Sequence, residues 1–118
     1  MKIKDFRKVI EFVRKEIFSE LPLQQLDMLL LVHEREGIPQ GEISKVMGMP
    51  QATVSRNIAR LARRQIRGDR GQVEWVGYGL VENRIDPVET RQYQVFLTDK
   101  GTQFMAKLEQ VLAERKGE

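Results

Sequence analysis

Hydrophobic side chains recur at helical spacing near both ends of the chain. Intervals of three and four residues separate them, which places each set along one face of a helix. The intervals predict helices over about 3–18 and about 99–114, and Thr98 is suited to cap the second of these. The apolar positions are Ile3, Phe6, Ile10, Val13 and Ile17 in the first helix, and Phe104, Leu108, Val111 and Leu112 in the second.

Helical patterns also fill the chain as far as about residue 66. A helix is predicted over about 23–36, followed by two more over about 40–47 and about 51–66 with a tight turn between them. The apolar residues of the last helix follow an i, i+4, i+7 spacing, so its opposite face displays arginines and small residues. The apolar residues of this helix are Val54, Ile58 and Leu61.

The hydrophobic period changes from helical to two after residue 79. Residues 80–85 and 93–97 are predicted as strands, and the polar segment 86–90 joins them into a β-hairpin. Segment 62–78 precedes them. Its first part, RRQIRGDRG, can extend the preceding helix, and QVEWVGYG alternates well enough to add a strand or pack on the core. The sequence leaves the placement of segment 62–78 open.

Composition bounds the class of protein. With 118 residues the chain is expected to form one domain, 1–118, and its 41% hydrophobic content is sufficient for a core. No apolar run approaches the roughly 18 residues of a membrane span, and charged residues occupy the N-terminus, so we expect a cytosolic protein that does not contact a membrane. Metal, cofactor and catalytic motifs are missing from the sequence. There is no cysteine, and the single histidine, His33, lies in an apolar helical pattern. We therefore predict a protein that is not an enzyme, with no cofactor and no metal.

Positive charge is concentrated in the middle of the chain. The net charge is only +3, yet residues 51–71 contain six arginines and one acidic residue. A local excess of this kind attracts polyanions, first nucleic acid and second an acidic protein surface. Arginine also offers a planar fork that can bond to guanine or phosphate, and small neighbours allow close approach. The helix over about 51–66 is therefore a candidate to enter a DNA major groove.

The order of predicted elements is that of a winged helix-turn-helix, mainly α with a small β-hairpin wing. The stretch EISKVMGMPQATVSRNIARL resembles the helix-turn-helix of the MarR family of bacterial regulators. The stretch GLVENRIDPVETRQYQVFLTDKG resembles that family's wing and the start of its last helix, including a Leu-Thr-x-x-Gly pattern at Leu97, Thr98 and Gly101. Family members usually have about three residues where this chain has 62–78, so the resemblance makes that segment an insertion.

The resemblance implies how the wing would work. An acidic residue two positions before an arginine would hold that arginine for the minor groove, and Glu89 and Arg91 match these positions. An arginine at a hairpin tip suits a narrow, electronegative minor groove. The candidate DNA contacts fall into three groups. Base edges are assigned to Gln51, Ala52, Thr53, Arg56 and Arg60, phosphates to Ser55, Asn57, Arg63 and Arg64, and the wing contacts to Arg84, Glu89 and Arg91.

The terminal segments 1–20 and 99–118 are predicted to form a dimer interface around a winged-helix core over 23–97. The resemblance implies this arrangement, and two copies of a recognition helix would read a symmetric site. All nine apolar residues of the two terminal stripes are assigned to the interface. The alternative is that both stripes close the core of a single protomer.

These observations predict a dimeric regulator of transcription that binds specific double-stranded DNA at an inverted repeat, with repression as the effect that the resemblance favours. An unidentified small-molecule effector is left open. Two other functions also remain open: a winged-helix module that recruits proteins, and an architectural protein that coats DNA without sequence preference. A duplex footprint would separate the first alternative from a regulator, and a preferred site would separate the second.

Overall fold

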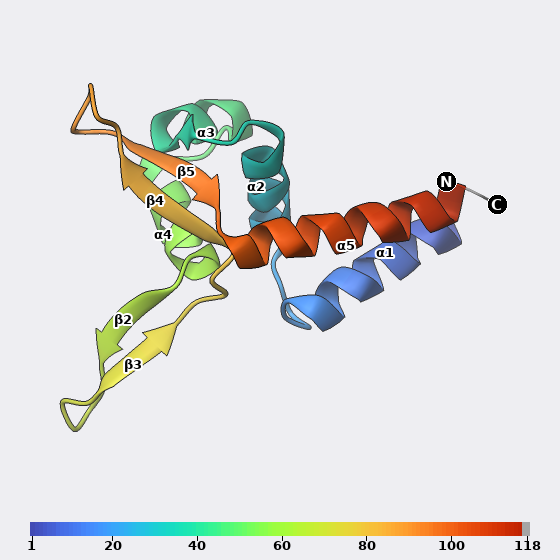
Figure 1. Ribbon diagram of the computed structural model, residues 1–118, viewed down its shortest axis with the longest axis horizontal. Coiled ribbons are helices and arrows are strands. Elements are labelled where there is room, and N and C mark those ends of the chain that lie inside the picture. Colours follow the sequence, from blue (N-terminus) through green and yellow to red (C-terminus); the bar gives the residue numbers. More distant parts are fainter. Residues whose placement is uncertain (117–118) are drawn as a thin grey trace.

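The terminal helices lie side by side on one side of the molecule, and the other helices and the antiparallel hairpins lie on the opposite side (Figure 1). The computed structural model describes residues 1–116. The elements in chain order are α1 (Ile3–Glu16), α2 (Leu23–Glu34), β1 (Ile38–Pro39), α3 (Gln40–Met47), α4 (Gln51–Leu61), β2 (Arg64–Arg67), β3 (Val73–Val76), β4 (Val81–Ile85), β5 (Tyr93–Leu97) and α5 (Asp99–Lys116).

The strands form two separate sheets. One has the order β1-β5-β4, with Ile38 opposite Val95 and Val81 opposite Leu97. Its β4–β5 hairpin is the predicted wing. The other sheet is the two-stranded hairpin β2–β3, which lies in the segment 62–78. The fold is therefore a winged helix-turn-helix of mixed α and β structure, as the sequence predicted, with a second hairpin added.

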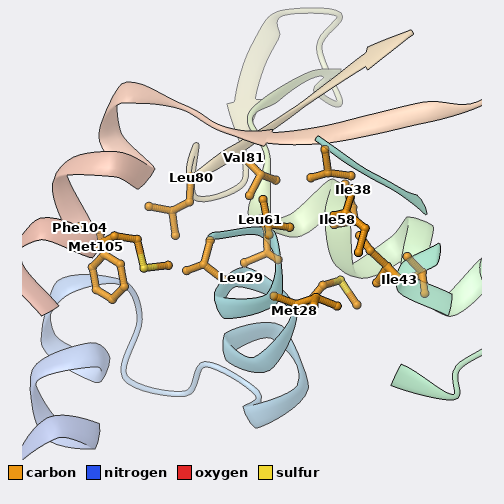
Figure 2. Packing of buried hydrophobic residues seen from close by; sticks show 14 of the residues in the cluster. Met28, Leu29, Ile38, Ile43, Ile58, Leu61, Leu80, Val81, Phe104 and Met105 are labelled. Atoms are coloured by element: carbon orange, nitrogen blue, oxygen red, sulfur yellow. The ribbon is translucent and has the colours of Figure 1, made fainter. Parts of the chain in front are cut away.

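The core lies where α2, α4 and the start of β4 meet, and it continues to α5 (Figure 2). Met28, Leu29, Ile58 and Leu61 have no exposed surface. Burial of side chains of this size contributes about 1.5–3 kcal/mol each. The predicted apolar face of α4 is thus confirmed, and this packing fixes which face of α4 points outward.

Helix α4 ends at Leu61, five residues before the predicted end. Ala62 has an extended backbone, with φ −85° and ψ 180°, and the chain leaves the helix there. The last carbonyl groups of a helix need partners outside it. Here the segment that returns from β3 supplies them, because the amides of Tyr78 and Leu80 donate to the carbonyls of Arg60 and Leu61 at 3.0 and 2.8 Å. Partners from this later segment thus decide the end of α4.

The terminal helices pack against each other within one protomer. Val13, Phe104 and Leu108 are buried in the core, and the ring of Phe12 stacks on that of Phe104 with centroids 5.8 Å apart. The assignment of Val13, Phe104 and Leu108 to a dimer interface was therefore wrong: the protomer itself covers these three side chains, as the alternative for the stripes proposed.

The remaining apolar residues of the terminal stripes stay accessible to different degrees. Ile3 and Phe6 are 89% and 55% exposed, and Ile10, Ile17, Val111 and Leu112 are partly exposed. Residues 117 and 118 of the predicted terminal segment 99–118 lie outside the described residues. None of the helices within 1–116 combines the length and the apolar content that crossing a membrane requires.

Candidate nucleic-acid interface

The outward face of α4 carries exposed positive charge. Gln51, Ala52, Arg56 and Arg60 are exposed, and Thr53 is partly exposed. Among the residues that the structure describes, no carboxylate lies within 4.0 Å of the guanidinium of Arg56 or Arg60. A guanidinium without a carboxylate partner keeps its N–H donors for an external acceptor. Four of the five residues assigned to base edges, Ala52, Thr53, Arg56 and Arg60, therefore share an accessible helix face. Gln51 is exposed at the first position of α4 but is turned away from Arg60 around the helix.

Asn57 was wrongly assigned to phosphate. Its exposed fraction is 6%, and its side chain joins α4 to α2. Gln25 Nε2 donates to Asn57 Oδ1 at 3.1 Å, while Asn57 Nδ2 donates to the carbonyl of Thr53 at 2.9 Å. Asn57 lies one residue before Ile58 on the helix, at the edge of the apolar face. Because Asn57 is polar, it was predicted to be exposed to solvent. In the structure Gln25 gives it a buried polar partner.

Replacing Asn57 with alanine is expected to lower the free energy of unfolding by about 1–3 kcal/mol, because the buried amide of Gln25 loses its acceptor. Urea unfolding followed by circular dichroism measures this loss. Arg56→Ala serves as the control on the same helix, since Arg56 is exposed and a surface change of this kind stays within about 0.5 kcal/mol. Equal stability of the two variants would contradict a structural role for Asn57.

A polar bridge connects α4 to the wing. The hydroxyl of Ser55 donates to Gln40 Oε1 at 3.0 Å, and Gln40 Nε2 donates to Asn83 Oδ1 at 2.8 Å. The bridge thus runs from α4 through the first residue of α3 to β4. Gln40 and Asn83 were not predicted from the sequence, because the bonded partners are 15 and 43 residues apart and no local pattern marks them.

The tip of the wing is organised by Asp86. Its Oδ1 accepts the amides of Val88 and Glu89 at 2.8 and 3.1 Å, which is the local bonding that makes aspartate favourable in turns. The expected pairing of Glu89 with Arg91 was wrong, because no ion pair joins them within the described residues. Arg91 is exposed near the tip. The order Asp-Pro in the loop was the available signal for this turn.

Arg84 is held along the wing. Its Nε donates to Glu82 Oε1 at 2.9 Å, and its guanidinium lies 4.1 Å from the ring centroid of Phe96. The carboxylate of Glu82 offsets the charge of Arg84. Arg91 is therefore the wing arginine whose charge no carboxylate of the described chain offsets.

Arg63 and Arg64 do not lie on α4. Arg63 follows the end of the helix, and Arg64 is the first residue of β2, so their assignment to the recognition helix was wrong. Both line a cleft of about 1040 Å³. Its walls come from the end of α4, the base of the β2–β3 hairpin, β4 and the start of α5. The cleft connects the recognition helix with both hairpins.

Comparison with known proteins agrees with this geometry. The model of a family described as the MarR family matches residues 19–66, which contain α2, α3 and α4. No curated protein is a significant match to the chain.

Solved structures share the fold over most of the chain. A MarR transcriptional regulator from Methanosarcina mazei Go1 is 23% identical, with a TM-score of 0.63 over 94% of this chain and 70% of that one. A mutant MarR from E. coli is 20% identical, with a TM-score of 0.64 over 95% and 70% of the two chains. MepR from S. aureus, in a complex with DNA, is 17% identical, with a TM-score of 0.68 over 93% and 80%.

Proposed function

We propose that this chain, a MarR-like winged helix-turn-helix protein, is a regulator of transcription that binds a specific double-stranded DNA sequence. It acts as a homodimer on an inverted repeat and represses transcription by occupying that site. The observation that carries the proposal is the face of α4, where Arg56 and Arg60 lie beside small residues and have no carboxylate partner within residues 1–116. Such a face suits the major groove, where arginine can bond to guanine.

The remaining contacts follow from this placement. Gln51, Ala52 and Thr53 approach base edges near the start of α4, and Ser55 holds a phosphate from the side of the helix that faces the wing. Arg91 enters the minor groove from the wing tip. The exposed apolar residues at the start of α1, Ile3 and Phe6, contribute to contact with the second copy.

Selection of the purified protein against random duplexes, followed by sequencing of the bound fraction, tests the proposal. An inverted repeat is the expected result, with half-sites about 34–36 Å apart or a multiple of this distance. Binding without any preferred motif, together with a steep dependence on salt, would replace the proposal with a DNA-coating protein. Absence of a protected footprint on any duplex would favour a protein-recruiting module.

Arg60→Ala is expected to lower affinity for the selected site about 5- to 150-fold, the equivalent of about 1–3 kcal/mol for a lost base contact. It should also relax the base preference at one position of each half-site, because a contact to a base edge carries sequence information. Fluorescence anisotropy with the selected duplex and with single-base variants measures both effects. Lys8→Ala is the control, since it removes one positive charge from an exposed position on α1. Equal losses on selected and random duplexes would assign Arg60 to phosphate instead.

A further inference from the structure

The β2–β3 hairpin projects from the end of α4 without packing on the core. All four residues of β2 are exposed, as are three of the four in β3. The hairpin and the wing diverge on the side of the molecule opposite α1 and α5, with α4 between them (Figure 1). A two-stranded hairpin is only marginally stable alone, so the β2–β3 hairpin depends on its attachment to the rest of the protein.

Backbone hydrogen bonds attach the hairpin to the recognition helix. The amides of Tyr78, Gly79 and Leu80 donate to the carbonyls of Arg60, Ala62 and Leu61, at 3.0, 3.4 and 2.8 Å respectively. The hairpin therefore leaves the end of α4 in a set direction. DNA that contacts α4 would therefore meet the hairpin in this fixed orientation.

The two faces of the hairpin differ in charge. Gln65 lies opposite Trp75 and Arg67 opposite Val73, and directly opposed residues share a face. We name this side, together with Arg63, the Trp75 face; it contains two arginines and no carboxylate. The other side pairs Arg64 with Val76 and Ile66 with Glu74, so that its one arginine is balanced by one carboxylate.

Trp75 orders a cation on its face. The guanidinium of Arg63 lies 4.2 Å from the ring centroid of Trp75. Stacking uses the flat side of the guanidinium and leaves its N–H donors around the edge, where phosphate oxygens can bond in the plane. Trp75 is itself 54% exposed. Among the described residues, no carboxylate comes within 4.0 Å of Arg63 or Arg67.

We propose that the Trp75 face is a second wing that grips the DNA backbone beside the major groove occupied by α4. Arg63 and Arg67 bond to phosphates, and Trp75 packs against the sugar. This inference rests on the proposed function and adds a contact surface to it. One feature favours DNA over an acidic protein segment: Arg63 lines the cleft that reaches from the end of α4 to β4 of the first wing.

Trp75 provides a direct test, because it is the only tryptophan in the chain. Acrylamide quenching of its fluorescence is measured with the full-length protein alone and with saturating selected duplex. A duplex labelled at one end reports binding separately, by anisotropy. We expect the quenching constant to fall at least twofold when DNA is bound. If the quenching constant falls when the protein concentration is raised in the absence of DNA, self-association covers Trp75 and the proposal is overturned.

Variants matched in charge test the argument. Arg67→Ala removes one cation from the Trp75 face, and Lys8→Ala removes one from an exposed position on α1. Arg67→Ala is expected to reduce the slope of log K against log salt by about 0.9, the value for one phosphate, while Lys8→Ala leaves the slope unchanged. Arg63→Ala/Arg67→Ala should reduce it by about 1.8. Circular dichroism melting checks that each variant is folded.

The outcomes separate this inference from the function on which it rests. If the wild-type protein binds a selected duplex while Trp75 stays equally quenchable and Arg67→Ala retains the wild-type slope, the second wing is refuted and the regulator remains. Equal slope losses for Lys8→Ala and Arg67→Ala would also overturn the assignment to the Trp75 face. If the wild-type protein binds no duplex, the proposed function fails, and the second wing with it.

Discussion

Gly77→Ala is expected to lower the free energy of unfolding by about 3 kcal/mol, because two costs add at this position. Gly77 has φ +96°, a conformation that residues with a Cβ rarely adopt. A Cβ there would also overlap the carbonyl oxygen of Ala62 and approach that of Arg60 to 3.2 Å. These carbonyls accept the amides that hold the hairpin to α4, so neither can move away without breaking a bond. Urea unfolding measures the loss.

A second glycine of the hairpin separates the two costs. Gly71 also has positive φ, +78°, but a Cβ there would have no neighbour within 4 Å. Gly71→Ala is therefore expected to cost only the backbone term, about 1–2 kcal/mol. Similar losses of unfolding free energy for Gly77→Ala and Gly71→Ala would show that the close approach of Gly77 to the end of α4 adds no cost.

Gly101→Ala is expected to have an effect of similar size, about 3 kcal/mol, for a different reason. Its helical backbone accepts alanine, but a Cβ would overlap the carbonyl oxygen of Leu80 and lie 3.3 Å from Leu97 Cδ2. The Leu80 carbonyl already accepts the amide of Thr98 at 3.0 Å. The first turn of α5 would have to move off the base of the wing to make room. The same unfolding measurement detects the loss.

Thr102→Ala is the control for Gly101→Ala in the same turn of α5. Thr102 is exposed, so its change should stay within about 0.5 kcal/mol of the wild-type value. A loss below about 1 kcal/mol for Gly101→Ala would mean that α5 and the wing can separate at little cost. The Leu-Thr-x-x-Gly pattern would then have no packing basis in this chain.

That pattern illustrates how a sequence motif acquires a physical meaning. The hydroxyl of Thr98 donates to the carbonyl of Gly79 at 2.6 Å and accepts the amide of Gly101 at 3.1 Å. Thr98 therefore caps α5 and ties it to the segment before β4. The sequence correctly identified the cap, whereas the partner 19 residues earlier became visible only in the fold.

Helix position and charge distribution were predictable because they depend on local features. The bounds predicted for the helix over 40–47 and the strand over 93–97 agree with α3 and β5. The apolar spacing of Val54, Ile58 and Leu61 correctly identified the buried face of α4. Periodicity carries this information since it is set by the geometry of the helix or strand itself.

Errors arose where a distant residue supplies the partner. Asn57 is polar and was placed outside, yet Gln25, 32 residues earlier, bonds to it in the interior. Val13 and Phe104 have the spacing expected of an interface stripe, but both are buried in the core where α1 packs against α5 within one protomer. The helix over 51–66 had no local stop signal at Leu61, because the amides that complete its last turn come from Tyr78 and Leu80.

By itself the sequence determined the order of helices, the wing, the core face of the recognition helix and the concentration of arginine in residues 51–71. The tertiary structure decided which of those arginines share a surface: Arg56 and Arg60 on α4, and Arg63 and Arg67 on a separate hairpin. The physical reason is that repeat spacing defines the faces of an element. What each face packs against is set by contacts between segments far apart along the chain.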